Sequence, residues 1–244
     1  GVSEYDWIGG VLGEPFEVLE SSVTGLPLPA NSEIVIEGTA YPDRKRDEGP
    51  FGEWTGYYAS DVRPEPTITI ERVMYRSNPI MLGSPPGKPP SELTAYRSVL
   101  RSALIWDDME KVGVPDIQGV WCHPAGGTRL LVIVSIKQRY AGHARQAGLA
   151  AMSCRAGAYL GRYVVVVDED IDPTNTWDVL WALTTRSDPA NDIDIIRRMW
   201  SGELTMMRRR NPCLRARRWT AASSSTVLRA GSVTNPIAPE APAG

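Results

Sequence analysis

The first 76 residues alternate between apolar and polar positions, which predicts β-strands joined by short loops. The clearest strands are expected at residues 32–40 and 67–75, which are rich in β-branched side chains. A shorter strand is expected at residues 16–20. Before it, Ser3 suits the N-cap of a short helix and Gly13 suits its stop. This part of the chain is therefore expected to be mostly β, as in part of a barrel or a sandwich.

The pattern changes after residue 90. Apolar residues recur at helical spacing from Ser91 to about Met109, and those on one face are Leu93, Tyr96, Leu100 and Leu104. Nearly continuous apolar runs predict buried strands, and helical spacing returns between and after them. The strands are expected at 117–121, 129–136 and 163–168, and the helices at 142–160 and 177–186. This alternation of strands and helices predicts an α/β layered unit.

A stretch rich in Gly and Pro, residues 83–90, separates the two patterns. Such a stretch breaks regular structure and indicates a domain boundary. We expect a first domain over residues 1–82, a linker over 83–92 and an α/β domain over 93–204.

Residues 205–244 differ sharply in composition. They contain seven Arg, no Lys or Asp, and the single acid Glu240, a net charge of +6 within a chain whose total is -3. One interpretation is a basic tail that binds an anionic surface. We prefer a disordered terminus or a shifted reading frame. Sequencing the gene across this point tests the second idea, and an intact frame would contradict it.

Bulk composition excludes several classes of protein. The chain of 244 residues has 42% hydrophobic and 23% charged residues, as in ordinary globular proteins. A net charge of -3 gives no general affinity for nucleic acid. Three Cys without a CxxC pair argue against a disulfide framework or a structural zinc site, and are typical of the cytoplasm. No apolar run is long enough to span a bilayer. The start at Gly1 resembles the middle of a longer protein.

The stretch from Glu48 to Tyr58 is the best candidate for chemistry. Its Gly-Pro-Phe-Gly segment, residues 49–52, cannot lie inside a helix or a central strand, so it forms a shaped loop between Glu48 and Glu53. Paired carboxylates on such a loop suit proton transfer. The alternative is a solvated loop whose acids pair with Arg44 or Arg46 in the charged connection before it. From spacing alone this alternative is favoured, because surface acids are common.

Other candidates are weaker. Asp168, Asp170 and Asp172 resemble an oxygen-ligand cluster, but they lack the Gly and the distal Glu of a calcium loop. A capped strand-to-helix turn is the preferred interpretation. His123 and His143 have no partner at metal-ligand spacing and are expected to be structural or exposed to solvent.

Several stretches together favour a functional role for the loop at residues 48–53 over a plain surface loop. They are EYDWIGG at 4–10 with GEP at 13–15, PANSEIVIEG at 29–38, EGPFGE at 48–53 with GYY at 56–58, and DVLWALTTR at 178–186 with DP at 188–189. In this order and spacing the chain resembles the second half of a UbiD-type decarboxylase, a family that uses prenylated FMN. The resemblance covers residues 1 to about 204. It implies a mixed α+β and α/β chain, with the C-terminal part of a split β-barrel flavin-binding domain followed by the α/β domain.

The resemblance implies roles for three residues. Glu4 matches a carboxylate ligand to the divalent ion, Mn²⁺ or Mg²⁺, that binds the cofactor phosphate. Glu48 and Glu53 match the two glutamates of a Glu-Arg-Glu network. Glu53 would protonate the carbon that loses CO2, and Glu48 would hold the arginine that receives the substrate carboxylate. That arginine and the other metal ligands lie upstream in the family, so the chain alone is not expected to turn over substrate.

The family removes a carboxyl group from aromatic, heteroaromatic or α,β-unsaturated acids, or adds one at high CO2. Membership also implies K⁺ as a further ion, an FMN prenyltransferase that supplies the cofactor, and a homo-oligomer, either a dimer or a hexamer. Two rivals stay open, a non-catalytic flavin-binding or assembly subunit and a barrel-type FMN reductase. Neither rival needs two carboxylates on the loop at 48–53.

Overall fold

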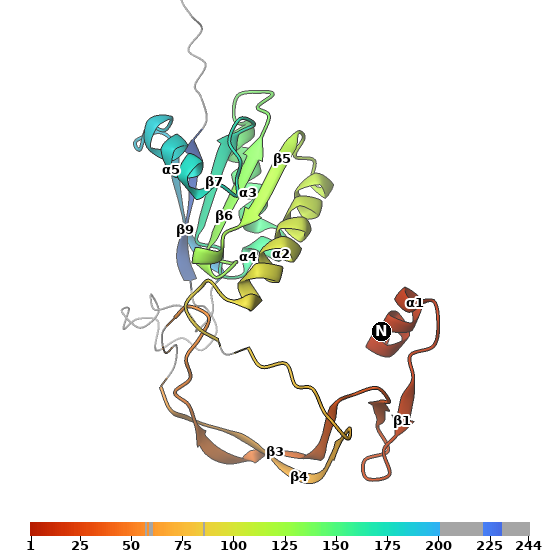
Figure 1. Cartoon of the computed structure of the whole chain (residues 1–244). Coiled ribbons are helices and arrows are strands. Elements are labelled where there is room, and N and C mark those ends of the chain that lie inside the picture. Colours follow the sequence, from red (N-terminus) through yellow and green to blue (C-terminus); the bar gives the residue numbers. More distant parts are fainter. Residues whose placement is uncertain (57, 59–60, 85, 201–221, 231–244) are drawn as a thin grey trace, which may run out of the picture. The chain divides into compact units, whose positions relative to one another are not determined.

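The computed structural model describes residues 1–56, 58, 61–84, 86–200 and 222–230. The chain divides into two compact units (Figure 1). Unit 1 comprises Gly1–Pro50 and Asp61–Pro85, and unit 2 comprises Phe51–Ser60 and Pro86–Gly244. Residues 51–60, expected in the first domain, therefore belong to unit 2. Among the described residues, no helix combines the length and the apolar character needed to cross a membrane.

Unit 1 begins with helix α1, Glu4–Leu12, followed by strands β1, Val18–Glu20, and β2, Pro27–Pro29. The predicted ends of the helix are confirmed. Ser3 accepts a hydrogen bond from the Tyr5 amide, and Gly13 ends the helix in the left-handed region at φ 77°. Strands β1 and β2 form a small antiparallel pair.

A second antiparallel pair in unit 1 joins β3, Ile34–Glu48, and β4, Arg63–Tyr75. Strand β3 is longer than predicted, because the charged residues 43–47 continue the strand instead of forming a connection. A register shift between Tyr41 and Lys45 accommodates Pro42, which a regular ladder would not tolerate. Among the described residues, β1–β2 and β3–β4 are separate two-stranded sheets, and no closed barrel is formed.

The β3–β4 ribbon exposes its apolar side chains. Ile36, Ile68 and Tyr75 are 59%, 64% and 70% exposed, and none of the described residues of unit 1 belongs to a buried hydrophobic core. A contiguous apolar surface of this kind is normally covered by another part of a protein.

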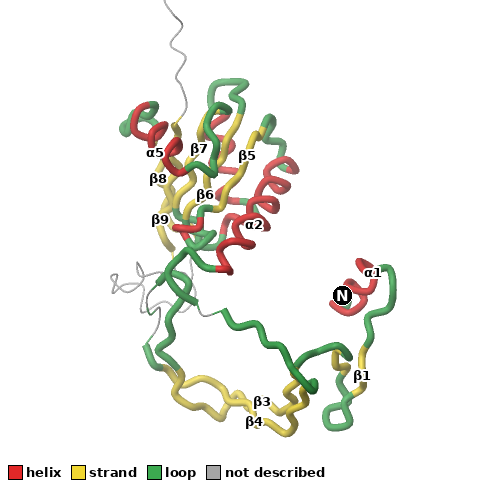
Figure 2. Tube along the Cα trace, in the orientation of Figure 1, coloured by secondary structure: helices red, strands yellow, loops and turns green. Residues whose placement is uncertain are grey.

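Unit 2 is built on a five-stranded sheet in the order β5-β6-β7-β9-β8 (Figures 1 and 2). Its strands are β5, Ile117–Cys122, β6, Leu131–Ile136, β7, Tyr163–Asp168, β8, Ile193–Trp200, and β9, Ala222–Ala230. Strands β6, β7 and β9 are parallel, and the edge strands β5 and β8 are antiparallel to their neighbours. The buried strands predicted at 129–136 and 163–168 are confirmed as β6 and β7.

The core of unit 2 lies on both faces of the sheet. Helices α2, Glu92–Lys111, and α3, His143–Ser153, cover one face, and α5, Thr176–Thr185, covers the other. Alternation in the strands explains the division, because Val164 and Val166 of β7 pack toward α2 and α3, whereas Val165 packs toward α5. The predicted α/β layering is therefore present.

Two details of the helices differ from the sequence analysis. The helix expected at 142–160 breaks at Cys154, and the short helix α4, Arg155–Ala158, follows it. The tight return of the chain there leaves no room at Gly157, where a Cβ would lie 1.9 Å from the Ala151 carbonyl oxygen. The second difference concerns α2. Its apolar stripe of Tyr96, Leu100 and Leu104 is exposed, and the buried face carries Thr94, Ser98, Ser102, Ile105 and Met109.

Within residues 205–244, the described part differs from the disordered terminus that was expected. Residues 222–230 form β9, between β7 and β8, whereas no regular structure was expected there. The rest of the predicted tail, 205–221 and 231–244, lies outside the described residues.

Candidate active site

Glu53 lies at the start of a tight turn. The Gly56 amide donates a hydrogen bond of 2.8 Å to the Glu53 carbonyl, and Gly56 has φ 87°, a conformation that favours glycine. Gly52 and Tyr58 pair as an antiparallel bridge across this turn. The Glu53 side chain is half-buried and forms no hydrogen bond or ion pair with any described residue. The loop is therefore shaped, as predicted, and leaves this carboxylate available.

Trp54 attaches the turn to the rest of unit 2. Its ring packs on Gly127, which follows the short 3-10 helix η1, Pro124–Gly126, and precedes β6. A Cβ on Gly127 would lie 2.0 Å from the Trp54 ring, and Gly127 also has a positive φ of 58°. The opposite side of the turn lies against Lys88, because a Cβ on Gly56 would be 2.7 Å from the Lys88 Cβ. Close packing at these two glycines positions Glu53.

Glu48 is the last residue of β3 and belongs to unit 1, whereas Glu53 belongs to unit 2. Glu48 is exposed and lies opposite Arg63 of β4 in the strand register. Among the described residues, it forms no ion pair with Arg44 or Arg46. The Arg44 guanidinium instead lies over the Tyr41 ring, 4.0 Å from its centroid. The exposure of Glu48 fits the surface alternative, whereas the ion pairs expected with it are not formed among the described residues.

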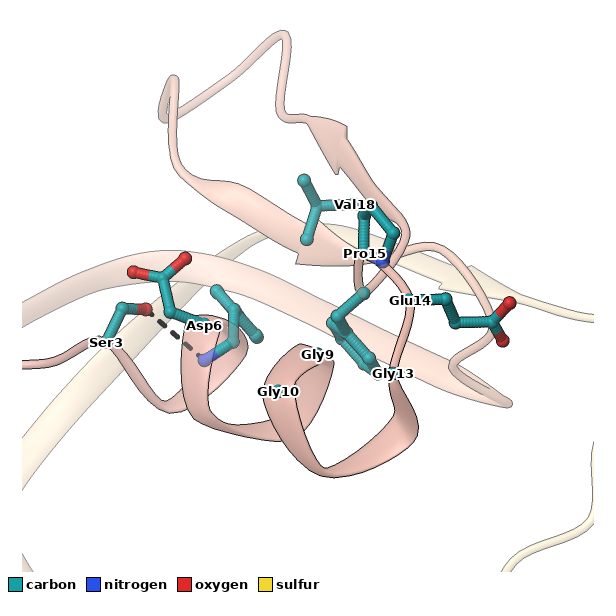
Figure 3. A pocket seen from close by; sticks show the side chains of 10 residues that line it. Ser3, Asp6, Gly9, Gly10, Gly13, Glu14, Pro15 and Val18 are labelled. Atoms are coloured by element: carbon teal, nitrogen blue, oxygen red, sulfur yellow. Dashed lines mark hydrogen bonds between the residues drawn. The ribbon is translucent and has the colours of Figure 1, made fainter.

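Glu4 is the first residue of α1 and is exposed. An open groove of about 740 Å³ runs beside this helix, and Figure 3 shows Ser3 and Asp6 near its N-terminal end with the glycines along it. The groove is lined by Ser3, Tyr5, Asp6, Gly9, Gly10, Gly13, Glu14, Pro15, Phe16 and Val18. Tyr5 stacks on Phe16 with the ring centroids 5.5 Å apart, which ties α1 to the chain that follows.

The described residues contain no group of three or more His, Cys, Asp or Glu arranged to hold a metal ion. Glu4 has the oxygen donors that a hard divalent cation prefers, so it fits as one ligand of such a site. The acidic turn after β7 is not an ion site, because its acids are used within the protein. Arg186 binds Asp170 through two hydrogen bonds of 2.8 and 2.6 Å, and Asp172 accepts from Thr174. The preferred interpretation as a capped turn fits these contacts.

A buried carboxylate lies outside the predicted site residues. Glu37 of β3 is only 4% exposed, and its Oε1 accepts hydrogen bonds from Ser21 and Thr24. The Arg72 guanidinium lies 3.7 Å from its Oε2. Glu37 thus ties the β1–β2 turn to the ribbon. The β pattern around Glu37 was the available signal. Successive side chains of a strand point to opposite faces, so Glu37 lies on the face opposite Ile34 and Ile36, and that face of β3 is the more buried one.

Both histidines hold structural positions. His143 is fully buried, its Nδ1 accepts from the Arg139 amide at 3.3 Å, and its Nε2 donates to the Pro115 carbonyl at 3.1 Å. His123 caps η1 by accepting from the Ala125 amide at 3.1 Å, and its Nε2 lies 2.8 Å from the Thr176 hydroxyl at the start of α5. These contacts agree with the structural role expected for both.

His123 predicts a dependence of stability on pH. Burial lowers its pKa from 6.5, so the unfolded chain takes up a proton at a higher pH than the folded chain. The free energy of unfolding should therefore decrease as the pH falls below about 6.5. Urea unfolding of wild type and His123→Asn at pH 7.5 and pH 5.0 measures this. The variant is expected to lose less stability between the two pH values, and an equal loss in both proteins would contradict the assignment.

Comparisons with known proteins agree with this architecture. The UbiD family model, which describes the Rift-related domain of 3-octaprenyl-4-hydroxybenzoate carboxy-lyase, matches residues 1–89. The C-terminal domain model of the same enzyme matches residues 95–213.

Solved structures are similar as well. The UbiD-class enzyme HmfF from Pelotomaculum thermopropionicum, in complex with FMN, has a TM-score of 0.76 and 26% identity over 100% of this chain and 51% of its own. The open form of vanillic acid decarboxylase from Sedimentibacter hydroxybenzoicus has a TM-score of 0.74 and 28% identity. The match covers 100% of this chain and 50% of the decarboxylase. Apo 3,4-dihydroxybenzoic acid decarboxylase from Klebsiella pneumoniae has a TM-score of 0.75 and 26% identity. The match covers 92% of this chain and 47% of that enzyme. The chain spans about half the length of these relatives. It belongs to the UbiD family of carboxy-lyases.

Proposed function

We propose that this chain is part of a prenylated-FMN-dependent carboxy-lyase that acts reversibly on an aromatic, heteroaromatic or α,β-unsaturated acid. The observation that carries the proposal is the Glu53 turn, which the Trp54 ring fixes on Gly127 while the carboxylate stays unpaired among the described residues. A proton donor needs this combination of a fixed position and an available carboxyl group. Family membership and the decarboxylases among the relatives support the same reaction class.

In this proposal the flavin supplies an electron acceptor for the density left on carbon when CO2 departs. Glu53 then delivers a proton to that carbon from the docked turn. Glu48, at the exposed end of β3, holds the arginine that orients the substrate carboxylate. Glu4 contributes one oxygen ligand to a Mn²⁺ or Mg²⁺ ion at the cofactor phosphate, and K⁺ is a further ion of the site. The arginine and the other ligands come from outside this chain.

The apolar surface of unit 1 supports this division of the site. The β3–β4 ribbon exposes Ile36, Ile68, Ile70 and Tyr75, and unit 1 has no buried apolar core among its described residues. The relatives are about twice as long as this chain. We infer that the half they contain in addition covers the ribbon, completes a split barrel with it and carries the missing arginine. The chain alone should then not release CO2.

Further parts of the proposal concern partners. The α/β unit is expected to support self-association, and the existence of an evolved dimeric form of HmfF is compatible with this expectation. An FMN prenyltransferase of the cytoplasm would supply the cofactor. The rivals, a non-catalytic flavin-binding or assembly subunit and a barrel-type FMN reductase, do not require the docked Glu53 turn.

The pigment bound by the assembled protein distinguishes these possibilities. The chain would be produced together with the additional half that the relatives contain, in cells that make prenylated FMN. Absorbance and mass spectrometry of the released pigment are expected to identify prenylated FMN. Unmodified FMN would favour the reductase, and absence of any flavin would contradict the proposal. Omission of the prenyltransferase is the control, and it should leave FMN in place of the prenylated form.

A further inference from the structure

Helix α5 of unit 2 carries two exposed tryptophans. Trp177 is 78% exposed and Trp181 is 46% exposed, and Leu180 beside them is 51% exposed. Residues three and four positions apart are neighbours on a helix surface, so these three side chains form a continuous apolar area. The opposite side of α5 packs on the sheet through Val179 and Ala182. We call Trp177, Leu180 and Trp181 the tryptophan face.

The tryptophan face has few contacts within the described part of the chain. The Trp177 ring contacts no other ring or cation among the described residues. The Arg186 guanidinium lies over the Trp181 ring, 4.7 Å from its centroid, and covers one side of it. Tryptophan is a large, mainly apolar side chain that usually contributes to cores and interfaces. Two of them exposed side by side indicate a surface that another segment covers.

The chain leaves β9 close to the tryptophan face. Strand β9 runs parallel to β7, and Ala230 pairs with Val167, one residue before β7 ends at Asp168. The Arg186 guanidinium, which lies over Trp181, is 3.9 Å from the Asp168 carboxylate. Helix α5 contacts both β7 and β9 (Figure 1). The chain therefore leaves the sheet at the Arg186 end of α5, where Trp181 is the nearer of the two tryptophans.

The sequence that follows β9 suits an aromatic surface. Residues 231–244 lie outside the described residues and include Pro236, Pro239 and Pro242. Their spacing of three matches the three residues per turn of a polyproline II helix, so the three rings would share one side of such a helix. Proline-rich segments of this form bind surfaces lined by aromatic rings, and they lose little conformational entropy on binding.

The segment can reach both tryptophans. An extended chain spans about 3.3 Å per residue, so the connection from Ala230 to Pro236 covers up to roughly 20 Å. Helix α5 has 10 residues and is about 15 Å long. Trp177 and Trp181 are about 6 Å apart along its axis, and successive prolines of the segment would be about 9 Å apart. Two prolines can therefore meet the two rings in succession.

We propose that residues 231–244 bind the tryptophan face of the same chain as a polyproline II helix. Pro236 contacts the Trp181 ring and Pro239 contacts the Trp177 ring, because the chain reaches Trp181 first. Burial of the proline and indole rings against each other provides the binding free energy. The proposal uses no residue that has a role in the proposed carboxy-lyase reaction, and it does not depend on which reading frame encodes the segment.

The indole NMR signals of the full chain test this contact. The chain contains eight Trp, and ¹⁵N labelling of the indoles gives one signal for each, assigned through single Trp-to-Phe variants. Replacement of Pro236 and Pro239 together by alanine is expected to shift the signals of Trp177 and Trp181. The signal of Trp7, which is 66% exposed in unit 1, should stay in place.

A second variant tests the spacing of the prolines. Ala238→Pro combined with Pro239→Ala keeps three prolines in the segment but moves one of them off the common side of the helix. It should shift the Trp177 and Trp181 signals in the same direction as the double alanine variant.

Proteolysis measures how well the segment is protected. Proteinase K at low concentration, followed by mass spectrometry, gives the rate of cleavage within residues 231–244. This rate is expected to be about tenfold higher in Trp177→Ala than in wild type, because loss of one ring contact raises the population of released segment. The matched control Trp7→Ala removes an exposed tryptophan of unit 1 and should leave the rate unchanged.

Three results would overturn the proposal. They are unchanged Trp177 and Trp181 signals in the double alanine variant, equal cleavage of wild type and Trp177→Ala, and protection in wild type that decreases on tenfold dilution. The last result would place the segment on a second copy of the chain. Circular dichroism checks the fold of Trp177→Ala, and the proline variants leave every described residue unchanged if that variant does not fold.

Discussion

Replacement of Glu53 by glutamine is expected to lower kcat for decarboxylation by about 10²- to 10⁴-fold in the assembled holoenzyme, with flavin still bound. Glutamine keeps the size of the side chain and the Glu53–Gly56 turn, which depends on backbone atoms. It removes only the ability to give a proton to carbon. Steady-state kinetics together with the flavin absorbance spectrum measure both parts of this prediction.

Glu53→Asp and Asp47→Asn are suitable controls. Aspartate retains the acid on a shorter side chain, so partial activity is expected. Asp47 is an exposed acid of β3 that the proposal does not use, and its replacement should leave kcat unchanged. Undiminished turnover in Glu53→Gln would refute the role of Glu53 as proton donor.

Replacement of Gly127 by alanine is expected to displace Trp54 and so release the Glu53 turn. The new Cβ would fall 2.0 Å from the Trp54 ring, and the positive φ at this position adds roughly 1–2 kcal/mol of backbone strain. Cleavage of residues 51–60 by a protease at low concentration measures the release, and it should be faster in the variant. Decarboxylation by the holoenzyme should fall together with this loss of order.

A double-mutant cycle separates the two effects of Gly127→Ala. In a Trp54→Ala background the ring is gone, so Gly127→Ala should cost only the backbone strain. If Gly127→Ala destabilises unit 2 equally in both backgrounds, Trp54 does not transmit the effect and the docking account is wrong.

Local signals predicted much of the fold. Ser3 and Gly13 bound α1, and Ser91 caps α2, because capping depends on a few adjacent backbone groups. Strands β6 and β7 were visible as apolar runs. The position of β9 between β7 and β8 was not visible, because strand order is set by contacts distant in sequence.

The apolar residues on one face of α2 show a second limit of prediction from sequence. Periodicity identified a helix with Tyr96, Leu100 and Leu104 on one face, but these side chains are exposed, and Ser98 and Ser102 lie against the sheet. Ser102 donates to the Ser98 carbonyl and accepts from the Cys122 amide, which allows a small hydroxyl to replace an apolar contact. A hydrophobic pattern shows that a face is available for packing and does not identify its partner.

The candidate site was only partly accessible from sequence. The loop pattern made Glu48 and Glu53 candidates, and only the family resemblance favoured them over a plain surface loop. Their assignment to different units and the packing of Trp54 on Gly127 depend on the tertiary structure. Glu37 was overlooked because carboxylates are exposed by default. In the tail, the family model extends to residue 213, past the boundary expected at 204. The shifted reading frame remains a prediction that gene sequencing can test.

The most direct test of the proposed reaction is CO2 release from a panel of aromatic, heteroaromatic and α,β-unsaturated acids. The assembled protein, loaded with prenylated FMN, would be compared with this chain alone and with its Glu53→Gln variant by measurement of CO2 in the headspace. We predict release by the assembled wild type for at least one acid, and none above background by the chain alone. Equal release by wild type and Glu53→Gln, or no release by the loaded assembly from any acid, would contradict the account.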